Sequence, residues 1–125
     1  MRQAYETWNV APGLDVADVT IEAVIDDWEG FRVLLRDHNG GRIFRITFEK
    51  HVAYLCRDES DLVGEVSRSD CVKGRLFYQV RNSEFLQRFA VDSAREYRDL
   101  RNYAIMTGVH CVDVLTQAEP RIEWL

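Results

Sequence analysis

Residues 31–48, FRVLLRDHNGGRIFRITF, decide the fold of this chain. Asn39-Gly40 predicts a two-residue type I′ turn, because both central residues of that turn need a positive φ that Asn and Gly tolerate. His38 then faces Gly41, and the strands pair from Asp37–Arg42 to Phe31–Phe48. One face of this hairpin carries six apolar side chains: Phe31, Val33, Leu35, Phe44, Ile46 and Phe48.

The register of this hairpin follows from its apolar pattern. A three-residue loop would shift the pairing by one residue and place Leu35 opposite Arg45, which breaks up the apolar face. The other face mixes polar and apolar side chains, so we expect solvent or a loop against it. An isolated hairpin is marginally stable, and this one therefore needs further strands or a helix packed on it.

Other segments predict those strands. β-branched and aromatic alternation favours strands over 19–25, 51–56, 75–81, 103–107, 111–116 and 122–124. Segment 103–116 reads as two strands or as one long strand with a bulge at Gly108. The N-terminal segment stays open between helix and strand, although its β-branched residues favour a strand over 19–25. Ala11-Pro12-Gly13 interrupts any element there.

One main helix is expected after residue 81. Ser83 or Asn82 can cap it, and Glu84 lies in the first turn, where the helix dipole favours a carboxylate. Its apolar stripe, with Phe85 and Phe89, would lie on the sheet, and it should end between 92 and 98. The expected fold is α+β: an antiparallel sheet of about five to seven strands, with one main α-helix packed on one face, in a single globular domain over 1–125.

The amino-acid composition limits the class of protein to which the chain can belong. The chain has 125 residues, is 46% hydrophobic and contains only 2 prolines, which is typical of a compact globular domain. No run of 18 apolar residues predicts a membrane span, and the first residues lack the apolar core of a secretory signal. We therefore expect a cytoplasmic protein that does not enter a membrane.

The charge of the chain limits the kinds of partner that we expect it to bind. The formal net charge is −5, which disfavours nucleic acid and anionic membranes. Residues 1–29 hold seven acids and one base, whereas 68–101 hold eight bases and five acids. These segments are either solvated surfaces or, for the first, an acidic edge that docks a basic partner.

No motif points to catalysis or to a cofactor. Cys56, Cys71 and Cys111 are too few and too far apart for a disulfide framework, so we expect buried or partly buried thiols. His110 and Cys111 are adjacent and would point to opposite faces of a strand, which argues against a shared metal. The acidic clusters at 26–29 and 58–61 lie in expected loops, where carboxylates are normally solvated. No catalytic residue, metal ligand or cofactor is assigned.

Several C-terminal segments resemble the corresponding part of small bacterial proteins of unknown function, over about a third of the chain. They are residues 82–86, 102–107, 112–115 and 119–124. The resemblance carries no catalytic residue and no named family. Chains of this size and type include immunity proteins that neutralise a toxin made by the same cell, and this analogy favours a binding role.

Two hypotheses follow. The first is a non-enzymatic protein-binding module, and its most specific version is an immunity protein or inhibitor. The contact residues for a basic partner would then be Asp26, Asp27, Trp28 and Glu29. The alternative is a small-molecule-binding domain or an unrecognised hydrolase. It would use a pocket between the helix and the sheet, with His51 or His110 beside a carboxylate. A homodimer is compatible with either hypothesis.

Overall fold

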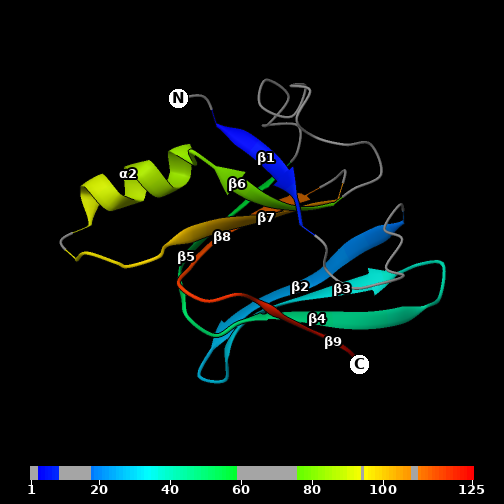
Figure 1. The fold of residues 1–125 in the computed structure, drawn as a ribbon. Coiled ribbons are helices and arrows are strands. Elements are labelled where there is room, and N and C mark those ends of the chain that lie inside the picture. The colour runs from blue at the N-terminus through cyan, green and yellow to red at the C-terminus, as the bar shows by residue number, and fades with distance from the viewer. Residues whose placement is uncertain (1–2, 9–17, 59–75, 94, 108–109) are drawn as a thin grey trace.

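The computed structural model describes residues 3–8, 18–58, 76–93, 95–107 and 110–125. These residues form nine strands and one helix, and the strands make two antiparallel sheets (Figure 1). The first sheet has five strands, in the spatial order β1 (Ala4–Thr7), β6 (Phe77–Arg81), β7 (Arg101–Met106), β8 (His110–Thr116) and β5 (His51–Asp58). The second has four, in the order β2 (Val19–Asp27), β3 (Gly30–Asp37), β4 (Arg42–Phe48) and β9 (Arg121–Trp124).

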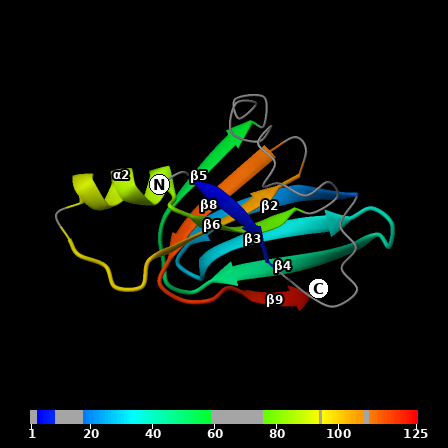
Figure 2. The same ribbon diagram turned by 45° about the horizontal axis from the view of Figure 1, so that its top comes forward.

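The two sheets lie face to face, and the main core fills the space between them (Figures 1 and 2). The four-stranded sheet contributes the six apolar side chains of the β3–β4 hairpin, all fully buried. Side chains from the three central strands of the five-stranded sheet pack against them: Phe77, Tyr103, Ile105, Val112 and Val114. Burial of apolar surface on this scale is the main stabilising contribution in the molecule.

The expected fold class is confirmed only in part, because the strands are arranged in layers differently from the prediction. The elements are antiparallel strands with one described helix, as predicted, but the strands are more numerous and belong to two sheets rather than one. The apolar face of the β3–β4 hairpin is therefore covered by a second sheet, not by the helix. Period-two patterning shows that a strand has a buried face, and it does not show what covers that face.

The register of the β3–β4 hairpin is confirmed, whereas its turn type is wrong. Phe31 pairs with Phe48 and Asp37 with Arg42, as the apolar pattern required. The connection is a four-residue loop, 38–41, closed by Gly41 N–H donating to the Asp37 carbonyl at 2.8 Å. The positive φ falls on Gly41 (68°) and not on Asn39 or Gly40. Asp37 Oδ1 also accepts from Asn39 N–H at 3.0 Å, an Asx turn that competes with the type I′ geometry.

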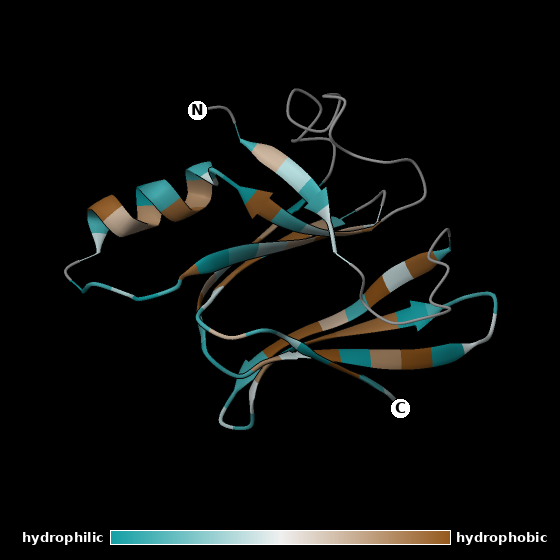
Figure 3. Cartoon of the chain, viewed as in Figure 1, coloured by the Kyte–Doolittle hydropathy of each residue, from teal (hydrophilic) through white to brown (hydrophobic). Residues whose placement is uncertain are grey.

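Strand β2 carries a bulge that its alternating sequence does not reveal. The pairing with β3 shifts between Ile21 and Ala23, so Glu22 is the extra residue. Ile21 and Val24 consequently both pack against the core, although strict alternation placed them on opposite faces. Figure 3 shows apolar and polar residues interleaved along β2 and β4.

Helix α2 (Glu84–Asp92) begins at the predicted cap. The Ser83 side chain accepts a hydrogen bond from Leu86 N–H at 3.0 Å. The helix projects from the end of the five-stranded sheet instead of lying along its face (Figures 1 and 2), and none of its nine residues is buried. Val91 is 83% exposed. The predicted apolar stripe, with Phe85 and Phe89, is thus only half-buried.

The remaining strands follow the sequence closely. Segment 103–116 forms two paired strands, β7 and β8, and not one bulged strand. The open N-terminal segment contributes β1, which pairs with β6, and the C-terminal strand β9 pairs with β4. The predicted break at 11–13, the acidic cluster beyond Asp58, the turn-rich segment 67–74 and Cys71 lie outside the described residues.

Candidate functional site

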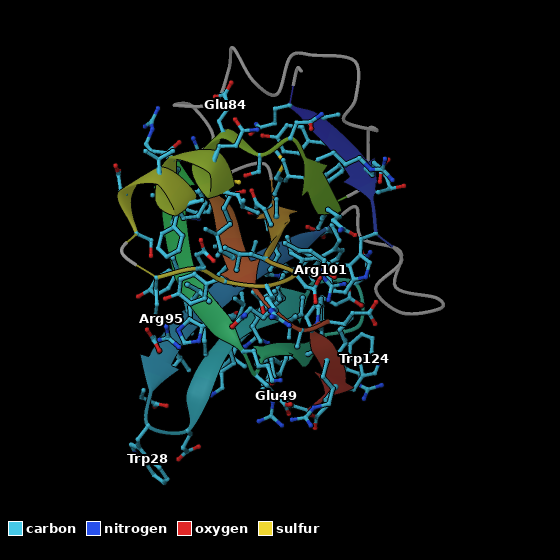
Figure 4. The ribbon with its side chains drawn as sticks, turned by 60° about the vertical axis from the view of Figure 1, so that its left-hand side comes forward. Trp28, Glu49, Glu84, Arg95, Arg101 and Trp124 are labelled. Carbon is cyan, nitrogen blue, oxygen red and sulfur yellow. The ribbon has the colours of Figure 1, made fainter. Side chains whose placement is uncertain are left out.

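The four residues predicted as a contact surface lie together at the turn between β2 and β3. Asp26 and Asp27 end β2, and Trp28 and Glu29 form the turn before Gly30. Trp28 is 91% exposed and points away from both sheets (Figure 4). We call residues 26–29 the hairpin tip.

The hairpin tip is held by hydrogen bonds within the turn. Asp27 Oδ1 accepts from Arg32 Nη1 at 2.8 Å and from Glu29 N–H at 2.9 Å. Arg32 Nη1 also donates to the Gly30 carbonyl at 3.0 Å. Gly30 has a φ of 116°, which side chains with a Cβ rarely adopt, so the turn needs glycine there. The backbone beneath Trp28 is therefore held by hydrogen bonds within the turn, although its indole ring is solvated.

The ion pair of the hairpin tip shifts the acidity of both partners. Its hydrogen bond to Arg32 lowers the pKa of Asp27 below 3.8, with a further contribution from Glu29 N–H. The same hydrogen bond raises the pKa of Arg32. Both groups are therefore charged at neutral pH, and the Arg32 guanidinium partly offsets the acidic character of the hairpin tip.

A histidine joins the hairpin tip to the other sheet. His51 Nε2, on β5, lies 3.3 Å from Asp26 Oδ1 on β2. The imidazole stacks on the buried Phe31 ring, with 4.8 Å between ring centroids. Tyr54, also on β5, packs against the same Phe31 ring, with 4.6 Å between ring centroids. The sheets are thus linked by a polar contact and an aromatic stack directly behind the hairpin tip.

The other two tryptophans have different surroundings. Trp8 packs between the sheets, with its ring centroid 5.0 Å from that of Tyr103. Trp124 is 38% exposed and lies under the Arg42 guanidinium at 4.4 Å. Figure 4 shows Trp28 and Trp124 well apart, so they do not form one aromatic patch.

A second candidate site is a pocket of about 130 Å³ between the first turns of α2 and the outer face of the five-stranded sheet. Both edge strands of the sheet, the central strands β7 and β8, and the helix contribute to the lining. The lining residues are Gln3, Tyr5, Leu55, Arg57, Glu84, Phe85, Arg88, Asn102 and Asp113. His51 and His110 are not among them, so the histidine–carboxylate arrangement considered from the sequence is not built here.

The floor of this pocket is a buried hydrogen-bond network. Asp113 is 3% exposed and Asn102 is 2% exposed. Asn102 Nδ2 donates to Asp113 Oδ1 at 3.2 Å, and Ser83 Oγ donates to Asn102 Oδ1 at 2.7 Å. Arg57 Nη2 donates to Asp113 Oδ2 at 3.0 Å. The buried carboxylate thus has both a counter-charge and hydrogen-bond donors, as burial of a charge requires.

Sequence reasoning did not single out the residues of this network. The available signal was polar side chains inside otherwise apolar strands: Asn102 before Tyr103, and Asp113 within Cys-Val-Asp-Val-Leu. A carboxylate on a buried strand needs a partner of opposite charge. Here the partner is Arg57 on β5, the strand that pairs with β8, and no feature of the sequence around Arg57 indicates this role.

The cysteines divide between surface and core. Cys111 is buried, as expected, whereas Cys56 is an exposed residue whose thiol is only partly desolvated. Cys56 lies on β5, which is an edge strand of the five-stranded sheet. Partial burial of its thiol, and then the charge of Asp113, raise the pKa of Cys56, so it is a weaker nucleophile than an ordinary thiol.

Within the described ranges, no three histidine, cysteine or carboxylate side chains gather as a metal site would require. In the same part of the chain, no helix has the length and apolar character to cross a bilayer. No protein-family model, curated protein or solved structure matches the chain.

Proposed function

We propose that this chain is a protein-binding module and that the hairpin tip is the centre of its contact surface. The observation that carries the proposal is Trp28, which is 91% exposed on a turn whose backbone is fixed. Tryptophan is large and apolar, and it is enriched among the residues that contribute most to protein–protein binding. Its exposure costs solvation free energy that a partner with an apolar pocket would recover.

The support of the hairpin tip makes it suited to binding. The Asp27–Arg32 ion pair, the Gly30 turn and the Asp26–His51 contact hold the base of Trp28 in one arrangement. A surface that is already ordered loses less conformational entropy when it binds. The partner therefore meets a rigid loop with one large apolar side chain.

The flanking charges favour a partner with basic groups around its apolar pocket. Three carboxylates, on Asp26, Asp27 and Glu29, flank Trp28 in the sequence, and Arg32 pairs with the last two of them. Opposite charges across an interface increase the association rate and suppress wrong partners. A cationic toxin neutralised by this chain, as an immunity protein would do, is the most specific form of the proposal.

Crosslinking at the hairpin tip tests the proposal. A photo-activatable phenylalanine derivative, which keeps a large aromatic ring at the site, is placed at residue 28 and, as a matched control, at Val91, which is 83% exposed on α2. Both variants are expressed in cells that make the protein, and adducts are identified by mass spectrometry. We expect one specific adduct from position 28 that is absent from position 91. Equal adducts from both positions, or none from position 28, would contradict the proposal.

The captured partner then allows a quantitative check. Trp28→Ala should weaken its affinity by roughly 30-fold or more, as truncation of a hot-spot residue does. Val91→Ala should leave affinity unchanged, and neither variant should change the melting temperature. An affinity unaffected by Trp28→Ala, and by the change of all four tip residues to Ala, would remove the hairpin tip as the contact site.

A further inference from the structure

We propose that the pocket beneath α2 binds a small carboxylic acid with a flat apolar body, about the size of benzoate. This inference is independent of the hairpin tip, because Trp28 lies at the end of the four-stranded sheet and the pocket lies on the outer face of the five-stranded sheet. It rests on the size of the pocket, its fixed polar floor, its two arginines and its apolar walls.

The volume sets the size of the ligand. A cavity of about 150 Å³ with apolar walls accommodates benzene, and the pocket here is about 130 Å³. Its mouth is open, so a charged substituent can remain partly in water. A ligand with one ring and one compact polar group fits this space.

The apolar walls favour a flat ligand body. Tyr5 on β1, Leu55 on β5 and Phe85 on α2 line the pocket from three elements. Aromatic side chains pack favourably against another ring in offset or edge-to-face geometry. The half-buried Phe85 would lose its remaining water contact when such a ring enters.

The two arginines favour a carboxylate over a neutral or cationic group. Arg57 and Arg88 line the pocket from β5 and α2. A guanidinium carries five N–H donors in a planar fork, so Arg57 can keep its bond to Asp113 and still meet a ligand oxygen. Arginine and carboxylate make paired, charge-assisted hydrogen bonds, which are stronger than neutral ones.

The two acids that also line the pocket do not cancel this preference. Both oxygens of Asp113 already accept hydrogen bonds, Oδ1 from Asn102 and Oδ2 from Arg57 and Cys111. Glu84 lies on the first turn of α2 and is exposed, so water screens its charge. Asp113 offsets the charge of Arg57, so Arg88 supplies the positive charge that a ligand carboxylate meets, and Arg57 supplies N–H donors.

The buried network makes the site pre-organised. Ser83, Asn102 and Asp113 are each at least nine-tenths buried and hydrogen-bonded to one another in series. The same Ser83 caps α2, so the network fixes the start of the helix, and hence the pocket wall, relative to the sheet. A ligand would find the floor of its site formed before it binds.

Binding of sodium benzoate tests the inference. Two-dimensional nitrogen–proton NMR spectra of the full chain are recorded with benzoate, with the neutral benzamide and with zwitterionic phenylalanine, each up to about 10 mM. We expect saturable benzoate shifts centred on Leu55, Phe85 and Asn102, with benzamide and phenylalanine about tenfold weaker, because they lack the unopposed carboxylate. No saturable benzoate binding, or equal affinity for the three probes, would overturn the inference.

Substitution of the exposed arginine provides the second measurement. Arg88 lies on the surface of α2, so Arg88→Gln should not disturb folding, whereas replacement of Arg57 would leave Asp113 buried without its counter-charge. Arg88→Gln should weaken benzoate by about tenfold. Arg121→Gln, on β9 of the other sheet, is the matched control and should have no effect. Equal affinity of both variants, or shifts that map away from the pocket, would also overturn the inference.

Discussion

The two faces of the five-stranded sheet are both buried, but in different ways. The inner face meets the β3–β4 hairpin through apolar side chains, such as Tyr103, Ile105 and Val112. The outer face mixes apolar residues with a hydrogen-bonded network through Asn102 and Asp113. An apolar layer stabilises in proportion to buried area, whereas a buried polar network depends on direction and on having every partner present. The inner face therefore determines whether the chain folds, and the outer face determines the geometry of a site.

The largest loss of stability should come from a substitution on the inner face. Phe44 is fully buried, and its ring centroid lies 6.2 Å from Phe77 across the two sheets. Phe44→Ala should reduce the free energy of unfolding by about 3–5 kcal/mol, since it removes a large buried side chain and leaves a cavity. Urea denaturation followed by circular dichroism measures the change.

The matched control for Phe44 is the same substitution on α2. Phe85 is only half-buried, so Phe85→Ala should cost about 1 kcal/mol. If the two variants were equally unstable, the space between the sheets would not be the dominant core, and the comparison of the two faces would fail.

The contribution of the outer face to stability should depend on its hydrogen bonds and not on its buried apolar area. Asn102→Leu keeps the side-chain volume similar and makes the position more apolar, so area alone predicts no loss of stability. The substitution removes the acceptor for Ser83 and a donor to Asp113. Leaving these buried groups without partners should cost about 1–3 kcal/mol. An unchanged or higher urea midpoint for Asn102→Leu would show that the network does not stabilise the outer face.

The β3–β4 turn gives a smaller effect and distinguishes two loop geometries. Gly41 has a φ of 68°, whereas Gly40 does not have a positive φ. Gly41→Ala should cost about 1 kcal/mol in urea denaturation, because a Cβ disfavours the left-handed region. A Cβ at Gly40 would meet only an oxygen of the Asp37 carboxylate, at an ordinary contact distance of 3.4 Å, so Gly40→Ala should change stability little. The reverse order would restore the two-residue turn inferred from Asn39-Gly40.

The sequence predicts local pairing well and layer arrangement poorly, for physical reasons. The register from Phe31–Phe48 to Asp37–Arg42 follows from alternation, since a slip by one residue would move six apolar side chains to the wrong face. The bulge at Glu22 was missed because an extra residue leaves no local signature in a strand of β-branched residues. The second sheet was missed because an apolar face specifies burial and not its partner.

The candidate sites differ in the same way. The hairpin tip is contiguous in sequence, so its residues could be named as a group from Asp26 to Glu29. The pocket is assembled from segments as distant as Arg57 and Asp113, and only the pairing of β5 with β8 brings those two side chains together. Sites built across strands in this manner require the topology to be known first.

The smallest effect concerns the hairpin tip, where neither a dry core nor a buried network is present. The hydrogen bond from Arg32 lowers the pKa of Asp27 below 3.8, so the folded state favours the ionised carboxylate. The stabilisation is therefore complete at pH values above 3.8 and is lost as the pH falls through the lowered pKa of the folded state. An NMR titration of the Asp27 carboxyl carbon should give a midpoint below 3.8 for the native chain. Arg32→Gln should raise that midpoint, while Arg121→Gln on the distant β9 should leave it in place. A midpoint that did not respond to Arg32→Gln would mean that the ion pair is not maintained in water, and the rigid base argued for Trp28 would lose its main polar support.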